Sequence, residues 1–247
     1  NTLYNIDYSG TYAAPLALAG EDMTATFNTI HDSGRDGVKP TGGGLTLMFN
    51  DVSYASRLAH DLGCIYTFGA DAYALSGRRS RIAYNWVHHR GDTTDQLSKG
   101  IYLDNGCRNF IVDHNVAWGL GSSSTDGALR MNSPNFGHVL YHNTVIGAGT
   151  YNDGTYTSYP DITTFGGYTF TDATHGMDIV AWNNLKVPDA STGTAFENFA
   201  AQDFTPKAAA TYADKRYVAA VAVVNPAASG GNVEWIKAAG DTNTSNS

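Results

Sequence analysis

The chain is poor in charged residues and in cysteine, and it has no long apolar run. Lys, Arg, Asp and Glu make up 15% of its 247 residues, against about 25% in an average soluble protein. No apolar run approaches the roughly 18 residues that a membrane-spanning helix needs. The net charge of −8 disfavours nucleic acid and anionic membrane surfaces as partners.

Several motifs of known chemistry are also missing. There is no phosphate-binding loop, dinucleotide fingerprint, zinc-finger spacing or nucleophile elbow, so nucleotide and esterase chemistry are set aside. No stretch of about 12 residues keeps apolar side chains at helical spacing. The 27 glycines and 15 tyrosines are instead typical of a strand-rich and turn-rich extracellular protein. Because the first residue is Asn1 and not Met, we expect a mature secreted product or an excised segment.

The two cysteines, Cys64 and Cys107, fall in neighbouring repeats of the chain. They are compatible with one disulfide and equally with two buried free thiols. The sequence leaves both alternatives open.

One short phrase recurs six times: an apolar residue, two variable residues, Asn, a variable residue, and an apolar or small residue. The copies are Ala25–Ile30, Leu47–Val52, Ile82–Val87, Val112–Ala117, Leu140–Val145 and Val180–Leu185. Their asparagines are Asn28, Asn50, Asn85, Asn115, Asn143 and Asn183, and the shortest separation is 22 residues. A period of this size predicts a solenoid, and the strand-like composition predicts that each repeat is a coil of short strands. An inward Asn in each coil could then pass side-chain hydrogen bonds along a ladder.

The copies around Asn85, Asn115 and Asn143, with the intervening segments 100–105 and 127–132, resemble the right-handed parallel β-helix, or pectin-lyase-like, superfamily. This resemblance implies an all-β solenoid of about seven coils with an internal Asn ladder. Residues 1–187 would form the β-helix, and residues 188–247 a less regular C-terminal extension. The superfamily includes polysaccharide lyases, glycoside hydrolases and non-catalytic adhesins, so the resemblance predicts fold more closely than chemistry.

A second strand lies between the asparagines of successive copies. Aligning its copies places Val38, Ile65, Ile101 and Leu129 at one inward position. Alternation then sends the following residues outward: Lys39, Tyr66, Tyr102 and Arg130, with Phe68, Asp104 and Asn132 beside them. Aromatic rings flanked by charges suit the apolar faces and hydroxyls of sugars, so the sequence predicts a polysaccharide-binding strip. The alternative is a solvated sheet face in which Tyr is chosen for its β-propensity.

The repeats carry insertions at residues 53–63, 70–80, 89–99, 119–126 and 147–160. Long loops on one side of a rigid scaffold build a cleft, and His88 is a candidate to line it. Asp104 and Asp61 are the candidate pair of carboxylates for glycoside hydrolysis, one as acid and one as base or nucleophile. The competing role for Asp104 is to cap the turn at Asn105 and Gly106.

Arg130 supports a second reading, β-elimination from a uronate-containing glycan. That reaction needs a cation to neutralise the carboxylate and a base to remove the neighbouring proton, and Arg130, Tyr102 and His88 could serve. The strip has few basic residues for a long uronate chain, so Ca²⁺ would have to assist, held by Asp71, Asp92 or Asp95. Hydrolysis needs no cofactor, and we rank it first.

A third reading is a non-catalytic structural or adhesive protein. Uncovered ends of a β-helix invite end-to-end self-association, and the apolar segment 217–224 of the extension could cap the last coil or pair with a neighbour. A metal site is not predicted, because His114 and His142 are expected to stack on adjacent coils without a third ligand.

Overall fold

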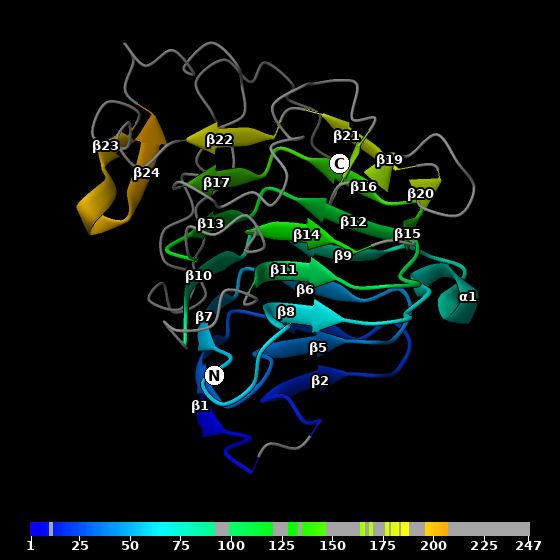
Figure 1. Cartoon of the computed structure of the whole chain (residues 1–247), viewed down its shortest axis with the longest axis horizontal. Coiled ribbons are helices and arrows are strands. Elements are labelled where there is room, and N and C mark those ends of the chain that lie inside the picture. The colour runs from blue at the N-terminus through cyan, green and yellow to red at the C-terminus, as the bar shows by residue number, and fades with distance from the viewer. Residues whose placement is uncertain are drawn as a thin grey trace, which may run out of the picture.

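The computed structural model describes residues 1–9, 12–91, 99–120, 128–132, 135–146, 164–165, 168–169, 176–177, 179–182, 184–187 and 196–206. These residues form an almost entirely β structure dominated by three parallel sheets (Figure 1). The one α-helix among them is the short α1 (Ala72–Ser76). The prediction of an all-β chain built from stacked parallel strands is confirmed.

Each sheet contains strands that are far apart in sequence. The seven-stranded sheet has the spatial order β1 (Thr2–Ile6), β4 (Thr29–Ser33), β7 (Asp51–Ala55), β10 (Trp86–Arg90), β13 (Val116–Trp118), β17 (Thr144–Ile146) and β22 (Leu185–Val187). The five-stranded sheet contains β2 (Leu16–Leu18), β5 (Val38–Pro40), β8 (Gly63–Thr67), β11 (Lys99–Leu103) and β14 (Leu129–Met131). The six-stranded sheet contains β3 (Thr24–Thr26), β6 (Thr46–Met48), β9 (Ser80–Ala83), β12 (Phe110–Asp113), β16 (Val139–Tyr141) and β21 (Val180–Trp182). Along the chain, a strand of the seven-stranded sheet is followed by one of the five-stranded sheet and then one of the six-stranded sheet, and this order repeats.

Three smaller pairs complete the described elements. β15 (Asn135–Phe136) pairs with β20 (Gly176–Met177), and β18 (Thr164–Phe165) pairs with β19 (Tyr168–Thr169). In the C-terminal extension, β23 (Phe196–Asn198), the 3₁₀ turn η3 (Phe199–Ala201) and β24 (Asp203–Pro206) form an antiparallel hairpin. Its buried Phe204 packs against Trp86 and Trp118 at ring-centroid distances of 5.6 and 4.9 Å. The segment 217–224 lies outside the described residues, and a domain boundary after residue 187 stays a prediction.

Side chains from all three sheets fill the interior. The alignment of the second strand is confirmed by its register: Val38 pairs with Ile65, Ile65 with Ile101, and Ile101 with Leu129. All four are buried. Cys64 and Cys107 are also buried and are free thiols, and burial raises the pKa of each to about 12. The disulfide alternative is therefore wrong.

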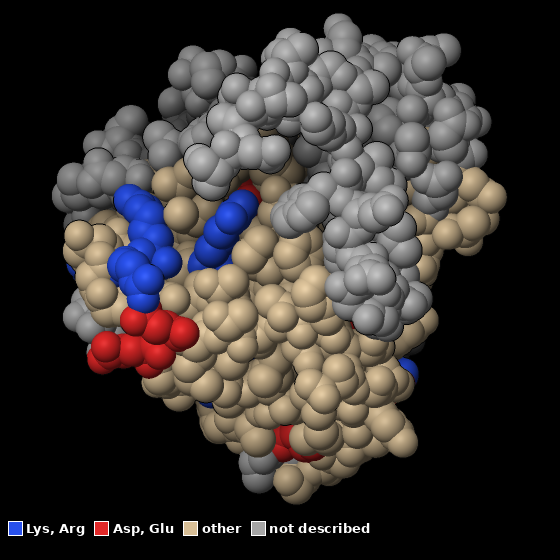
Figure 2. All heavy atoms as spheres, turned by 180° about the vertical axis from the view of Figure 1, so that it is seen from behind, with Lys and Arg blue, Asp and Glu red and all other residues tan. Residues whose placement is uncertain are grey.

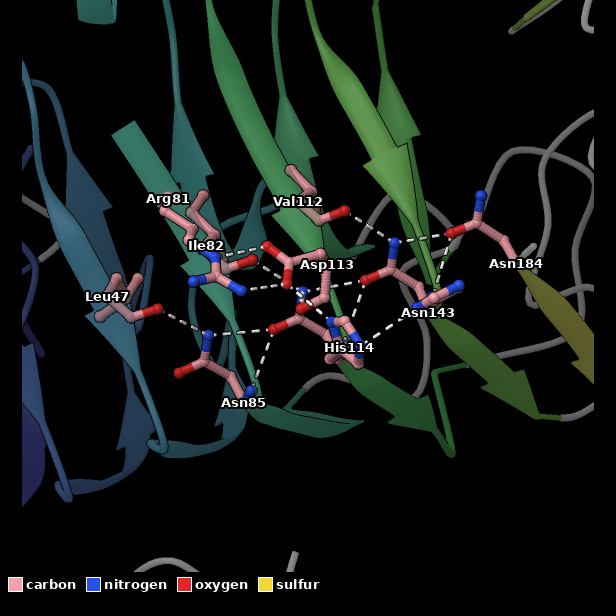
Figure 3. Close-up of polar contacts among 11 residues, drawn as sticks. Leu47, Arg81, Ile82, Asn85, Val112, Asp113, His114, Asn143 and Asn184 are labelled. Carbon is pink, nitrogen blue, oxygen red and sulfur yellow. Dashed lines mark hydrogen bonds and ion pairs between the residues drawn. The ribbon is translucent and has the colours of Figure 1, made fainter. Parts of the chain in front are cut away.

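Asparagine side chains connect successive passages of the chain where the six-stranded sheet leads into the seven-stranded sheet. Each amide Nδ2 donates to the Oδ1 of the next, over 2.7–3.1 Å, in the order Asn1, Asn28, Asn50, Asn85, Asn115, Asn143 and Asn184. Figure 3 shows the part from Asn85 to Asn184. The last member is Asn184, whereas the predicted Asn183 lies outside the described residues.

The residue before most of these asparagines has a left-handed backbone. Its φ is between 55° and 58° at Phe27, Phe49, Tyr84, His114 and His142. Such a backbone is unfavourable for a bulky residue, and here it makes the sharp bend between two sheets. The bend also aligns the rings, because Phe27, Phe49, Tyr84 and His114 stack in sequence at centroid distances of 4.7–5.2 Å.

One of the insertions lies where it was not expected. The segment 70–80 contains α1, which follows β8 and therefore lies at the opposite end of the five-stranded sheet from the connections that enter it (Figure 1). The prediction that all insertions lie on one side is wrong for this segment.

The face of the molecule that points away from the viewer in Figure 1 carries few charged side chains. Figure 2 shows basic and acidic groups gathered in small areas, with uncharged atoms over most of the visible described surface. This agrees with the low charged fraction of the chain.

Candidate active site

The predicted strip lies on the five-stranded sheet. Tyr66 of β8 pairs in register with Tyr102 of β11, and Tyr102 pairs with Arg130 of β14. Lys39 follows Val38, the register partner of Ile65, and so occupies the next place in the same row. The structure thus brings Lys39, Tyr66, Tyr102 and Arg130 into one row across four strands.

Asp104 lies at the centre of a hydrogen-bond network. Its carboxylate accepts from the Tyr66 phenol at 2.9 Å, the Tyr102 phenol at 3.0 Å, the Asn132 amide at 2.8 Å and the Asn105 backbone N–H at 2.8 Å. Three of these donors, Tyr102, Asn132 and Asn105, bind Oδ1, and Tyr66 binds Oδ2. Asp104 is 7% exposed and immediately follows β11, so it is held from two neighbouring strands as well as from its own turn. The bond from the Asn105 N–H is the predicted turn cap. The bonds from the two phenols and from Asn132 show that Asp104 also has partners outside its own turn.

The two tyrosines do not form the predicted open platform. Tyr66 is 8% and Tyr102 1% exposed, and both pack with the buried Leu62 from the connection between β7 and β8. Their ring faces are covered, so the expectation that they stack on sugar rings is wrong in this structure. Burial raises the pKa of both phenols, and the negative charge of Asp104 raises it further. Both phenols therefore act as hydrogen-bond donors to Asp104 and not as phenolate bases.

Asp61 is connected to Tyr102 through Lys99. Its carboxylate accepts a 2.8 Å bond from Lys99, whose ammonium group lies 4.6 Å from the centre of the Tyr102 ring. The Asp61 side chain is 57% exposed, whereas Lys99 is 2% exposed. Asp61 is thus a solvent-facing carboxylate held by a buried cation.

Arg130 contributes a cation at the end of the row. Its guanidinium carbon lies 6.0 Å from the centre of the Tyr102 ring, at the outer limit of a cation–π contact. Its Nε is buried and has no hydrogen-bond partner among the described residues. A buried donor without a partner is costly to the folded state.

The remaining predicted binding residues have separate surroundings. Phe68 is 59% exposed just beyond β8 and offers an open aromatic ring next to the row. Lys39 donates a 3.4 Å bond to the Tyr12 carbonyl. His88 lies in β10 of the seven-stranded sheet, bonded to Asp51 and stacked on Trp118 at 4.2 Å. The structure therefore does not bring His88 into the row.

Two charged residues near the row were not predicted from the sequence. Lys99 falls at the end of the predicted insertion 89–99, and nothing in the sequence links it to Asp61. Asp36 is fully buried, and within the described part of the chain neither of its carboxyl oxygens has a hydrogen-bond partner. Burial raises the pKa of Asp36 to about 7, partly offset by Arg35 and Lys39. An isolated Asp before a glycine reads as a turn residue, so no signal distinguished it.

The proposed calcium ligands are not assembled in the described part of the chain. Asp71 accepts from the Asn109 amide and from the Tyr73 backbone N–H, while Asp92 and Asp95 lie outside the described residues. The described residues contain no group of three or more His, Cys, Asp or Glu side chains suited to holding a metal ion. They also contain no helix with the length and hydropathy to cross a membrane.

The chain matches no protein-family model, no curated protein and no solved structure.

Proposed function

We propose that this chain is a secreted glycoside hydrolase that acts on a polysaccharide with Asp104 and Asp61 as its two carboxylates. The observation that carries the proposal is that both carboxylates are connected to Tyr102, Asp104 by a hydrogen bond from the phenol and Asp61 through Lys99, which lies against the ring. Glycoside hydrolysis requires two carboxyl groups in fixed positions, one to protonate the leaving oxygen and one to activate water or attack. Residues fixed by packing and hydrogen bonds are the ones that hold such geometry.

The two carboxylates differ in solvent exposure, and this difference suggests which of them activates water. Asp61 faces solvent and can act on a water molecule, with Lys99 fixing its orientation. Asp104 is enclosed and held by four donors, so it provides the second carboxyl group in a fixed position. The open ring of Phe68 provides an apolar surface for a sugar next to this pair.

The fold proposed with this function is a right-handed parallel β-helix of about seven coils, similar to the pectin-lyase-like superfamily. It is supported by the rotation of the chain through three parallel sheets and by the asparagine hydrogen bonds between successive passages. Polysaccharide-active enzymes are common on that architecture, so the fold supports the proposal by analogy.

The second candidate is a polysaccharide lyase, and Arg130 favours it. The partly exposed guanidinium of Arg130, at the end of the row, could bind the carboxylate of a uronate and so assist β-elimination. Ca²⁺ would supply the further positive charge. The third candidate, a non-catalytic adhesive or self-associating protein, is favoured by the exposed Tyr4, Tyr8 and Tyr12 near the edge strands β1 and β2.

One assay separates the three. The purified chain is incubated with a panel of neutral and uronic polysaccharides, and reducing ends and the ultraviolet absorbance of an unsaturated product are followed together. Reducing ends without new absorbance support hydrolysis, and both signals rising support elimination. Silence in both across the panel favours the adhesive reading and is then followed by sedimentation and electron microscopy of the protein.

A further inference from the structure

A second polar cluster lies on the outer face of the seven-stranded sheet, away from the Asp104 row. Asp51 of β7 accepts from His88 Nε2 of β10 at 2.7 Å. The other nitrogen of the same ring, His88 Nδ1, lies 2.7 Å from His89 Nδ1. His88 is buried and His89 is partly exposed, so the pair is reached from the His89 side.

Two consecutive residues of a strand normally point to opposite faces, and here they do not. His89 has a φ of 49°, in the left-handed region. The equivalent residues of neighbouring strands share this backbone: Asn5, Asp32, Tyr54 and Gly119 have φ between 51° and 66°. At these left-handed residues the side chains no longer alternate between the two faces of the sheet. The His89 ring therefore lies on the same side as the His88 ring. The left-handed backbone is thus a shared feature of these strands, and His adopts it more often than most residues do.

The neighbours hold the His89 ring in place. Tyr54 stacks on it at a centroid distance of 5.3 Å. On the other side, a Cβ at Gly119 would lie 2.9 Å from the ring, so the absent side chain leaves the space that the ring occupies. His88 is fixed in the same way by the stacked Trp118.

The hydrogen bonds determine which nitrogens are available. A carboxylate accepts only, so the Nε2 of His88 carries the proton toward Asp51 and its Nδ1 presents a lone pair in the neutral ring. The two facing Nδ1 atoms then share one proton, which an incoming cation can displace. A histidine whose second nitrogen donates to a carboxylate is the usual arrangement of a metal ligand.

We propose that His88 Nδ1 and His89 Nδ1 bind a divalent copper or nickel ion, with Asp51 orienting His88. With metal–nitrogen bonds of about 2.0 Å, the 2.7 Å separation of the two nitrogens corresponds to an N–metal–N angle of about 85°. Adjacent positions of a square-planar or tetragonal site, which copper and nickel prefer, are about 90° apart. The tetrahedral angle that zinc prefers is wider.

The protein supplies two ligands, so the remaining positions are open to water or another small ligand. This agrees with the finding that no three metal-binding side chains cluster in the described residues. The site is therefore exchangeable, and the Irving–Williams order predicts tighter binding of Cu²⁺ than of Ni²⁺ or Zn²⁺. Binding releases the proton shared by the two nitrogens into solvent.

A similar arrangement elsewhere in the chain provides an internal control. Asp113 accepts from His114 Nδ1 at 2.7 Å, and His114 Nε2 lies 3.1 Å from His142 Nδ1. There, however, Arg81 makes two bonds to Asp113, at 2.8 and 2.6 Å (Figure 3). The guanidinium compensates the carboxylate and repels a cation, and the wider nitrogen separation fits a 90° site less well. We assign no metal to this second pair.

The experiment titrates the full chain, without a histidine tag, with Cu²⁺, Ni²⁺ and Zn²⁺ and follows tryptophan fluorescence. Trp118 stacks on His88, so Cu²⁺ at the site should quench it in a one-to-one titration, and electron paramagnetic resonance should report nitrogen ligands. The variant His89→Asn removes the ligand with a residue that tolerates a left-handed backbone. The matched control is His142→Asn, which makes the same exchange at a φ of 55°.

The expected result is Cu²⁺ affinity at least about tenfold weaker in His89→Asn, as the loss of one of two protein ligands implies, and unchanged in His142→Asn. Both variants should show the circular dichroism spectrum of the parent. Equal Cu²⁺ affinity in the parent and His89→Asn would overturn the proposal. So would the absence of one-to-one quenching, or a loss confined to His142→Asn.

Discussion

The Tyr66 phenol donates a 2.9 Å hydrogen bond to the carboxylate of Asp104, although the two residues are 38 positions apart in the sequence. The bond joins β8 to the end of β11 across the five-stranded sheet. Tyr102 donates to the other oxygen of the same carboxylate. A single acidic side chain therefore links two buried aromatic residues, and changes at any of the three should affect stability.

Replacing Tyr66 or Tyr102 with Phe tests this link. Either change removes a buried donor from Asp104 while keeping the ring, and three donors remain. We expect a loss of about 1–2 kcal/mol in the free energy of unfolding, measured by urea denaturation. Tyr73→Phe is the control, because Tyr73 is 54% exposed, and it should leave the stability unchanged. Equal stability in all four proteins would mean that the Asp104 bonds contribute nothing.

The asparagine hydrogen bonds predict that replacing a buried asparagine costs more stability than replacing an exposed one. Asn115 donates to Ile82 O, Asp113 O and Asn143 Oδ1 and accepts from the side chain of Asn85, and it is 2% exposed. We expect Asn115→Ala to cost about 3 kcal/mol or more, because several buried groups lose their partners. Asn1→Ala at the exposed start of the row should cost under about 1 kcal/mol. Similar losses at both positions, measured by thermal unfolding, would contradict this account.

Asp36 predicts a pH dependence of stability. Its pKa is raised from 3.8 to about 7 by burial, so the folded protein binds this proton more tightly than the unfolded chain does. The contribution is therefore fully present below about pH 4 and is lost as the pH rises toward 7 and beyond, by up to about 4 kcal/mol. Asp36→Asn should flatten this part of the profile in urea unfolding at about pH 5 and pH 8.

The control for that profile is Asp22→Asn at an exposed ion pair with Arg78, which should keep the slope of the parent. Other groups act in the opposite direction. The pKa of Asp113 is lowered, because its bonds to Arg81 and His114 outweigh its burial, so its contribution falls away in acid. Only the difference between the parent and Asp36→Asn isolates Asp36, and a slope unchanged in that variant would show that Asp36 does not titrate in this range.

Substitution of two glycines by Ala distinguishes the cost of backbone strain from the cost of a steric clash. Gly69 has a φ of 64°, and no described atom lies within 4 Å of the place that a Cβ would take, whereas Gly119 has a φ of 66° and faces the His89 ring. Gly69→Ala should cost about 1 kcal/mol from backbone strain alone. Gly119→Ala should cost at least about 1 kcal/mol more, because Tyr54 prevents the ring from moving away. Equal thermal unfolding losses in the two variants would show that the His89 ring yields freely.

Periodic features of this fold were predictable from the sequence, and local departures from period were not. The inward positions Val38, Ile65, Ile101 and Leu129 follow from alternation along each strand, and the register agrees with them. The covering of Tyr66 and Tyr102 by Leu62 was not predictable, because the path of a connecting loop has no period. His89 faces the side of His88 because of a left-handed residue within a strand, which alternation cannot anticipate.

The position of one candidate carboxylate was predictable from the sequence, and the position of the other was not. Asp104 lies two residues beyond Tyr102, so strand geometry alone places both on one side. Asp61 is in a loop, and it is connected to the site through Lys99, which falls at the end of the predicted insertion 89–99. Pairings between a loop and a strand depend on tertiary packing and leave no local signal.

The most direct test of the central claim is the rate of reducing-end release from the best polysaccharide of the panel, compared between the parent, Asp104→Asn, Asp61→Asn and Arg130→Gln. Hydrolysis by the carboxylate pair predicts a loss of at least about 100-fold in each aspartate variant, a smaller loss in Arg130→Gln, and no ultraviolet-absorbing product. Full activity in Asp104→Asn, or an absorbing product whose formation depends on Arg130, would contradict it.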